Sequence, residues 1–213
     1  MYPIEDTPIE LRLHPFEGSF PSAIPGTRSF TEAPCYVVRG IFSYKNTRYI
    51  AHSYKFYFAD NLAIGFGWCC FPKADCLGYH ANDVEGIVVL YDYDNKKPRW
   101  VYYDAHSRGQ GEWVAWDKCE KTRDGALVVY SARGSHGMYA KGKTYLRGFG
   151  FANDLCSKNG KHIRITEYLN AFNWKSPNGI KLTDTIQNLA QKSVTPWQRF
   201  VICYYVDKLR NGM

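Results

Sequence analysis

The chain has 213 residues, of which 45% are hydrophobic and 22% are charged, and this balance excludes a wholly disordered protein. Its formal net charge is +7, but the basic residues are spread along the chain without a run of like charge, so we do not expect a nucleic-acid partner. Aromatic residues make up 16% of the chain, and because aromatic side chains favour strands, the composition predicts a β-rich domain.

The cysteines and the N-terminus bear on where the protein resides. The cysteines number 7, an odd count without a Cys-x-x-Cys pair, which fits neither a disulfide framework nor a zinc ribbon. The N-terminal residues lack the basic and apolar regions of a signal peptide. The longest uncharged stretch, residues 61–72, is too short to span a bilayer. We therefore expect an intracellular or virion protein without a transmembrane segment.

Residues 1–34 are rich in proline. They hold six of the ten prolines: Pro3, Pro8, Pro15, Pro21, Pro25 and Pro34. Proline fixes φ and removes the backbone donor, so we expect an extended arm there rather than a strand or helix. Such an arm is expected to pack on its own domain or on a neighbouring protein.

The next hundred residues read as short strands separated by turns. The turn signals are clearest at residues 45–47 and 92–98. No helical period lies between the segments, so they predict an antiparallel β-sandwich. The predicted strands are residues 35–44, 48–58, 61–71, 85–93, 99–105, 112–116 and 126–132.

The pattern changes past Gly150. Residues 182–192 and 195–212 read as helices, the second with Thr195 as N-cap, Pro196 at the first helical position and Gly212 at its end. A strand over residues 198–206 is the alternative, because that stretch is also aromatic and β-branched. The sequence thus predicts one sandwich domain, residues 35–213, with one or two C-terminal helices from about residue 183.

One stretch combines a histidine with two acids. Asp83 and Glu85 are two residues apart, so on a strand they share a face. His80 can join them only if the chain turns or bulges around Ala81 and Asn82. One imidazole and two carboxylates form a credible site for Mg²⁺, Ca²⁺ or Mn²⁺.

Two later histidines, His106 and His136, could extend this site. With either of them recruited, Fe²⁺ or Zn²⁺ becomes a candidate. The alternative is structural: Asp83 caps a turn, Glu85 is a solvated edge charge, and each histidine is hydrogen-bonded in place.

Three motifs follow one another between about residues 58 and 142. They resemble the vacuolar protein sorting 62 family and, more distantly, the necrosis- and ethylene-inducing-like proteins. ARGSHGMY is the most specific piece. The motifs are HANDVEGIVVLYD, VYYDAHSRGQGEWVAW and VVYSARGSHGMYAKG.

The second resemblance implies a β-sandwich like that of the actinoporin cytolysins, with a divalent metal. In that family a histidine, an aspartate and a glutamate help hold the metal and two histidines follow; the matching positions are His80, Asp83, Glu85, His106 and His136. The chain departs at Asn82 and Val84, where the family has a histidine and a tryptophan. The signal peptide that toxin function requires is also missing.

The leading functional hypothesis is a non-enzymatic binding or structural module within a larger assembly, such as a minor capsid protein of a large DNA virus. Such a module would contact protein neighbours through the N-terminal arm. We expect it to be non-enzymatic because no nucleophile–base pair occurs at a recognisable spacing in the sequence. One alternative is a metal-dependent, cytolysin-like protein that binds an anionic membrane or a glycan. The other is a metal-dependent hydrolase in which the metal activates water and His106 or His136 acts as general base.

Overall fold

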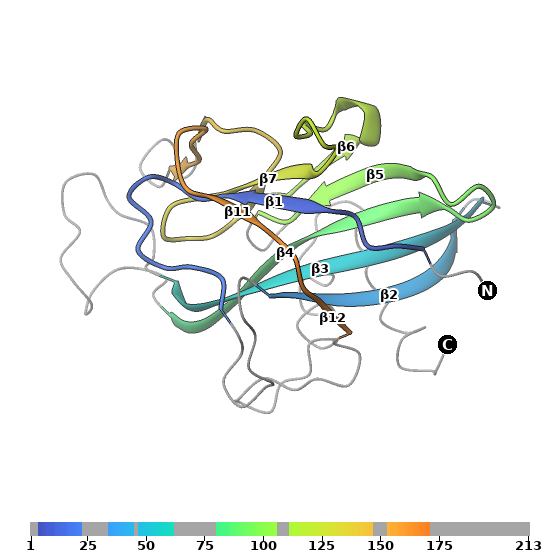
Figure 1. Cartoon of the computed structure of the whole chain (residues 1–213), viewed down its shortest axis with the longest axis horizontal. Helices are drawn as coiled ribbons and strands as arrows, with labels where there is room; N and C mark the ends of the chain where they lie inside the picture. Colours follow the sequence, from blue (N-terminus) through green and yellow to red (C-terminus); the bar gives the residue numbers. More distant parts are fainter. Residues whose placement is uncertain are drawn as a thin grey trace.

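The computed structural model describes residues 4–22, 34–44, 47–61, 80–105, 111–146 and 153–170 of the chain. These residues form a six-stranded sheet, a four-stranded sheet and a two-stranded ribbon (Figure 1). The only regular helix within these ranges is the 3₁₀ turn η1, Trp116–Lys118.

The larger sheet has the order β12-β2-β3-β4-β5-β6. In this sheet the five strands from β2 to β6 each pair antiparallel with the next, and β12 pairs parallel with β2. The strands are β2 Cys35–Tyr44, β3 Thr47–Asn61, β4 His80–Asp92, β5 Pro98–Tyr103, β6 Glu112–Ala115 and β12 Tyr168–Asn170.

The smaller sheet has the order β11-β1-β7-β8, and its central pair, β1 and β7, is parallel. The ribbon pairs β9 with β10. The strands are β1 Ile9–Arg12, β7 Leu127–Ser131, β8 Met138–Tyr139, β11 His162–Arg164, β9 Thr144–Tyr145 and β10 Asp154–Leu155.

The larger sheet and the smaller sheet both contribute to the main hydrophobic cluster of the described residues. Ile9 and Leu11 of β1 are fully buried in the same cluster as Tyr54, Phe56 and Phe58 of β3. Alternate residues of a strand point to one face, which is why these positions are spaced by two. The predicted β-sandwich is confirmed, and so are six of its seven predicted strands. The seventh, residues 61–71, lies almost wholly outside the described residues, as do both predicted C-terminal helices.

The N-terminal segment departs from the prediction at one point. Residues 9–12 form strand β1, so the expectation that this segment holds no strand is wrong there. The physical reason is spacing: Pro8 precedes the strand and Pro15 follows it, so the backbone donors between them can pair. The N–H of Leu13 also donates to the carbonyl of Lys161 (2.9 Å). The described part of the arm therefore packs on its own domain.

Gly86 occupies a position in β4 with no room for a side chain. A Cβ there would lie 2.1 Å from the carbonyl oxygen of Tyr54 and 2.7 Å from Cδ of Lys55, whereas one at Gly18 would meet nothing within 4 Å. We expect Gly86→Ala to lower the free energy of unfolding by about 1–3 kcal/mol, measured by urea denaturation, because the pairing of β3 and β4 must shift. Gly18→Ala is the control and should leave stability nearly unchanged; equal losses in both variants would contradict the packing described.

Candidate functional site

Two of the sequence motifs meet at one end of the sandwich. Asp83 lies near the start of β4, and His136 lies in the turn between β7 and β8. His136 Nδ1 is 2.9 Å from Asp83 Oδ2, so the two side chains are hydrogen-bonded. The structure therefore brings together two of the five predicted site residues that are 53 positions apart in the sequence.

The imidazole of His136 is held from several sides. Its ring stacks on Phe58 with 3.9 Å between centroids and 3° between planes, and its side chain is fully buried. Its backbone takes a φ of +53°, a conformation uncommon for residues other than glycine. Its Nε2 faces the carboxylate of Glu17 at 3.7 Å. Both ring nitrogens of His136 thus face carboxylates.

Glu17 reaches the site from the N-terminal arm. Its carboxylate accepts the backbone N–H groups of Gly134 (2.7 Å) and Ser19 (3.0 Å), and its side chain is 1% exposed. No sequence pattern predicts this role, because Glu17 lies in a proline-rich stretch without periodicity. We call Glu17, His136 and Asp83 the buried triad.

The charges of the buried triad support one another. Burial disfavours a charged His136, but the carboxylates of Asp83 and Glu17 outweigh it and raise the pKa of the imidazole above 6.5. Burial likewise opposes ionisation of Glu17, but the facing imidazole of His136 and hydrogen bonds from the N–H groups of Gly134 and Ser19 lower its pKa below 4.5. The triad thus favours a protonated imidazole between two ionised carboxylates.

Asp83 is also fixed by an amide. Nδ2 of Asn61 donates to Asp83 Oδ2 (3.2 Å) and to the carbonyl of Ser135 (3.3 Å). The hydroxyl of Ser135 donates to Asp154 Oδ1 (2.7 Å), and Tyr139 donates to the other oxygen of Asp154. Asn61 and Asp154 are functional candidates that sequence reasoning missed. Ser135 bonds Asp154 and not its neighbour His136, so the two are not a nucleophile and its base.

A buried lysine lies close by. Nζ of Lys55 is 3.4 Å from Oδ2 of Asp104, and both side chains are less than one-tenth exposed. Asp104 also joins three strands, because its N–H donates to the carbonyl of Gly86 (3.1 Å) and its carbonyl accepts the N–H of Met138 (2.8 Å). This pair balances one of the carboxylates at this end of the sandwich.

The carboxyl group of Glu85 has a strongly perturbed pKa. Burial, and then the like charges of Asp83 and Asp104, raise its pKa well above 4.5, against the opposing effect of Lys55. Among the described residues the carboxylates here therefore outnumber the cations Lys55 and His136. The acidic cluster comprises Glu17, Asp83, Glu85, Asp104 and Asp154.

The remaining predicted ligands are only partly described. The pairing of β3 with β4 runs without a register shift from Phe58↔Asp83 to Asn61↔His80, so the bulge that would turn His80 toward Asp83 is not seen in it. The side chain of His80 and all of His106 lie outside the described residues. Within the described ranges, no three His, Cys, Asp or Glu side chains converge to hold a metal ion. A metal site of His80, Asp83, Glu85, His106 and His136 stays a prediction.

The buried triad should make stability depend on pH. The raised pKa of His136 stabilises the fold fully below about pH 6.5 and less as pH rises through the folded value. The lowered pKa of Glu17 stabilises the fold fully above about pH 4.5, and this contribution is lost as the pH falls through the folded value. In excess chelator, the loss of unfolding free energy in His136→Gln should be largest between these limits and shrink above them. A loss that is the same from pH 5 to 9 would contradict a charged imidazole.

Neither a protein-family model nor a curated protein matches this chain. Solved structures with a similar fold include NLPPya in complex with mannosamine (12% identity, TM-score 0.45) and with glucosamine (15%, 0.45), each covering 95% of this chain and 86% of the other. Necrosis and Ethylene inducing Protein 2, from the causal agent of cocoa's witches' broom disease, is 15% identical with a TM-score of 0.40, covering 93% and 86%. The structural neighbours are thus necrosis- and ethylene-inducing proteins at low identity. The vacuolar protein sorting 62 resemblance finds no support among these matches.

Proposed function

We propose that this protein is a non-enzymatic binding module that holds a divalent cation at Asp83 and Glu85 and recognises a hydroxyl-rich glycan beside it. The observation that carries the proposal is the placement of Asp83 and Glu85 on one face of β4 with the carboxylate of Asp104 near them. A divalent cation would favour the ionised form of Glu85, whose pKa is raised by burial and then by the like charges of Asp83 and Asp104.

The geometry around Asp83 supports a cation there. Asp83 and Glu85 stand two residues apart on β4, and carboxylate oxygens are the ligands that Ca²⁺, Mg²⁺ and Mn²⁺ prefer. His136 and Asn61 both contact the same oxygen of Asp83, and so they set the orientation of its carboxylate. We assign His136 the role of orienting Asp83, because both of its nitrogens face carboxylates.

The same geometry disfavours hydrolysis by His136. A histidine that acts as a general base must be unprotonated and must reach the water that it activates. The raised pKa of His136 favours its protonated form, and its side chain is fully buried away from water, so it is poorly suited to that role. The hydrolase alternative would have to rest on His106, which lies outside the described residues.

A glycan is the ligand class that we propose for the open positions of the cation. Such cations take about six to eight oxygen ligands, more than two carboxylates supply, and sugar hydroxyls can complete the set. Mannosamine and glucosamine are the natural first probes, because they are the ligands named for two of the solved structures above.

The assembly hypothesis keeps the same fold but has less support. A minor capsid role needs partners for the N-terminal arm, yet residues 4–22 are tied to their own domain through β1 and Glu17. No helix within the described ranges has the length and apolar character needed to cross a membrane. The capsid role and an anionic membrane partner stay predictions.

Cation binding should raise the thermal stability of the protein. At a free concentration one hundred times Kd, a bound ion adds about 2.7 kcal/mol, which differential scanning fluorimetry with CaCl₂, MgCl₂ or MnCl₂ would detect. We expect Asp83→Asn and Glu85→Gln to lose the shift. Asp94→Asn, which removes an exposed carboxylate at the far end of β4, should keep it. The shift should also weaken toward low pH, because protons compete for Glu85. A full shift in Glu85→Gln would exclude this site.

Glycan binding should require the cation. Titration calorimetry with mannosamine and glucosamine should show binding in saturating cation and at least a tenfold loss in excess chelator, about 1.4 kcal/mol. Asp83→Asn should reproduce that loss without chelator. Binding that survives both treatments would refute the link between cation and glycan at the acidic cluster.

A further inference from the structure

Three of the four exposed large hydrophobic side chains of the described residues are Phe16, Phe20 and Leu146. Phe16 is 75% exposed and Leu146 is 78% exposed. Single apolar side chains are common on protein surfaces, whereas a group of them marks an interaction site. The question is therefore whether these three side chains share one surface and what surrounds them.

The two phenylalanines project from the N-terminal arm beside cations of other segments. The guanidinium of Arg133, in the turn between β7 and β8, lies 5.9 Å from the centroid of the Phe16 ring. The ammonium of Lys161, which precedes β11, lies 4.3 Å from the centroid of the Phe20 ring. Each exposed ring thus has a cation of its own against one face, at cation–π distance.

The β9–β10 ribbon continues this surface past Arg133. The N–H of Arg133 donates to the carbonyl of Leu155 in β10 (3.0 Å), and Leu146 directly follows β9, the strand that pairs with β10. The N–H of Cys156 donates to the carbonyl of Lys143 (3.1 Å), so the lysines flanking the ribbon lie there too. We call this surface the Phe face. Its members are Phe16, Phe20, Arg133, Lys141, Lys143, Leu146, Lys158 and Lys161.

The Phe face carries charge of one sign. Its five basic side chains are exposed, and none of them forms an ion pair with a carboxylate of the described residues. Residues 14–22, 131–146 and 153–164 contain only two acids, Glu17 and Asp154, which are 8% and 2% exposed. The potential at this surface is therefore positive and attracts anionic groups.

The arm holds Phe16 in a fixed turn. The N–H of Glu17 donates to the carbonyl of His14 (2.9 Å), and the N–H of Phe16 donates to Nδ1 of the same histidine (3.2 Å). Farther along, the N–H of Ser22 donates to the carbonyl of Tyr57 in β3 (2.9 Å). The ring is thus positioned before any partner arrives, which lowers the entropic cost of binding.

We infer that the Phe face binds an acidic segment of a partner protein that carries large apolar side chains between its carboxylates. The apolar side chains pack on the open sides of Phe16 and Leu146, and the carboxylates pair with the surrounding lysines and Arg133. Aromatic residues and arginine are the groups most enriched where proteins bind each other. This surface does not include Asp83 or Glu85, so the inference is independent of the function proposed above.

Two other anionic partners fit the Phe face less well. A bilayer would have to accept Arg133 and Lys161 together with the rings that they contact, and cations are costly within hydrocarbon. A single strand of nucleic acid stacks its bases on aromatic faces. Leu146 has no such face, and a cation already covers one side of each phenylalanine. A protein segment can use all three apolar side chains as they stand.

The test is fluorescence anisotropy of a short labelled peptide, in which aspartate and glutamate alternate with leucine, titrated with the full chain in excess chelator. We expect saturable binding that weakens about tenfold when NaCl is raised from about 0.05 M to about 0.5 M, because salt screens the ion pairs. A peptide with asparagine and glutamine in place of the acids lacks the ion pairs, and one with glycine in place of leucine lacks the apolar contacts. Each should bind about tenfold more weakly.

Charge reversal locates the ion pairs. Lys143→Glu combined with Lys158→Glu should weaken binding about tenfold at low salt and little at high salt. The matched control is Lys97→Glu combined with Arg99→Glu, which reverses two exposed cations around the start of β5 and changes the net charge by the same amount. The control should bind within about twofold of the wild type, because only nearby charges act strongly through water.

A truncation locates the apolar contact. Phe16→Ala should weaken binding about fivefold at both salt concentrations, because an apolar contact is not screened. The side chain is 75% exposed, so the variant should unfold at the wild-type temperature. Trp100→Ala removes an exposed aromatic side chain outside the Phe face and should leave the affinity unchanged.

Several results would overturn the inference. The control reversal could lose as much affinity as Lys143→Glu with Lys158→Glu, or Phe16→Ala could bind as the wild type does. Tighter binding to single-stranded DNA, or to vesicles of phosphatidylserine and phosphatidylcholine, that is lost in the same variants would assign the Phe face to another class of partner. Failure of the cation and glycan experiments would leave the inference standing, because the peptide is measured in chelator and Glu85→Gln should bind it normally.

Discussion

The organisation of this sandwich depends on the buried imidazolium of His136. The ion stands between Glu17 of the arm and Asp83 of β4, so one side chain joins three segments that are far apart in the sequence. Removing one partner of a buried ion pair typically costs about 3–5 kcal/mol, because a charge is left uncompensated. The arm, the β7–β8 turn and the start of β4 are therefore expected to stay together or to separate together.

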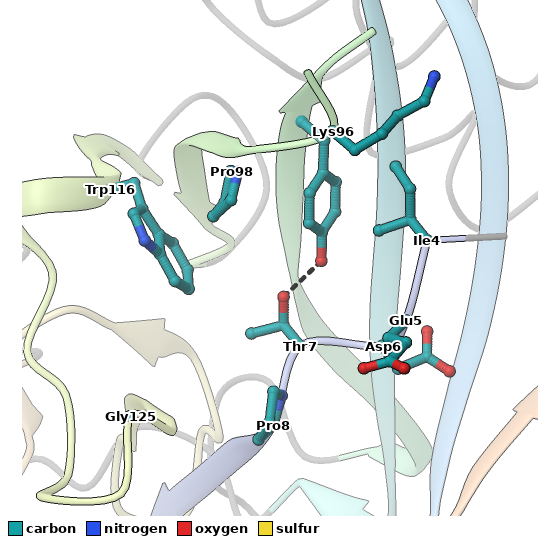
Figure 2. Close-up of a pocket in the computed structure, with 10 residues that line it drawn as sticks. Ile4, Glu5, Asp6, Thr7, Pro8, Lys96, Pro98, Trp116 and Gly125 are labelled. Carbon is teal, nitrogen blue, oxygen red and sulfur yellow. Dashed lines mark hydrogen bonds between the residues drawn. The ribbon is translucent and has the colours of Figure 1, made fainter. Parts of the chain in front are cut away.

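Different interactions dominate at the two ends of β4. At one end charge dominates: the acidic cluster brings carboxylates together with His136 and Lys55, and hydrogen bonds from Asn61, Ser135 and Tyr139 keep it in place. At the other end hydroxyl groups dominate: those of Thr7, Tyr54 and Tyr91 are hydrogen-bonded to one another or to the Thr7 backbone, in a hollow that Trp116 also lines (Figure 2). A long, rigid strand suits this division, because it fixes both ends without coupling their chemistry.

Much of the fold follows from local pattern, whereas the site depends on distant contacts. The bounds of β2 were predicted to the residue, because alternation and turn residues are visible locally. β1 was missed, because its partner β7 lies more than a hundred residues away and proline counts suggested otherwise. Asp83 and His136 were found through their motifs. Glu17 and Asp154 were not predicted, because no motif surrounds them and their hydrogen-bond partners are brought close only by folding.

The position of β1 has a consequence for how the chain is made. This strand is synthesised early, yet it lies between β7 and β11, so its second neighbour is residues 162–164. Contacts of such long sequence separation form slowly, since a large loop must close before they contribute. During synthesis the apolar side chains of Ile9 and Leu11 lack their final neighbours until β7 and β11 have left the ribosome. In a nascent chain this strand is therefore exposed to chaperones and to aggregation.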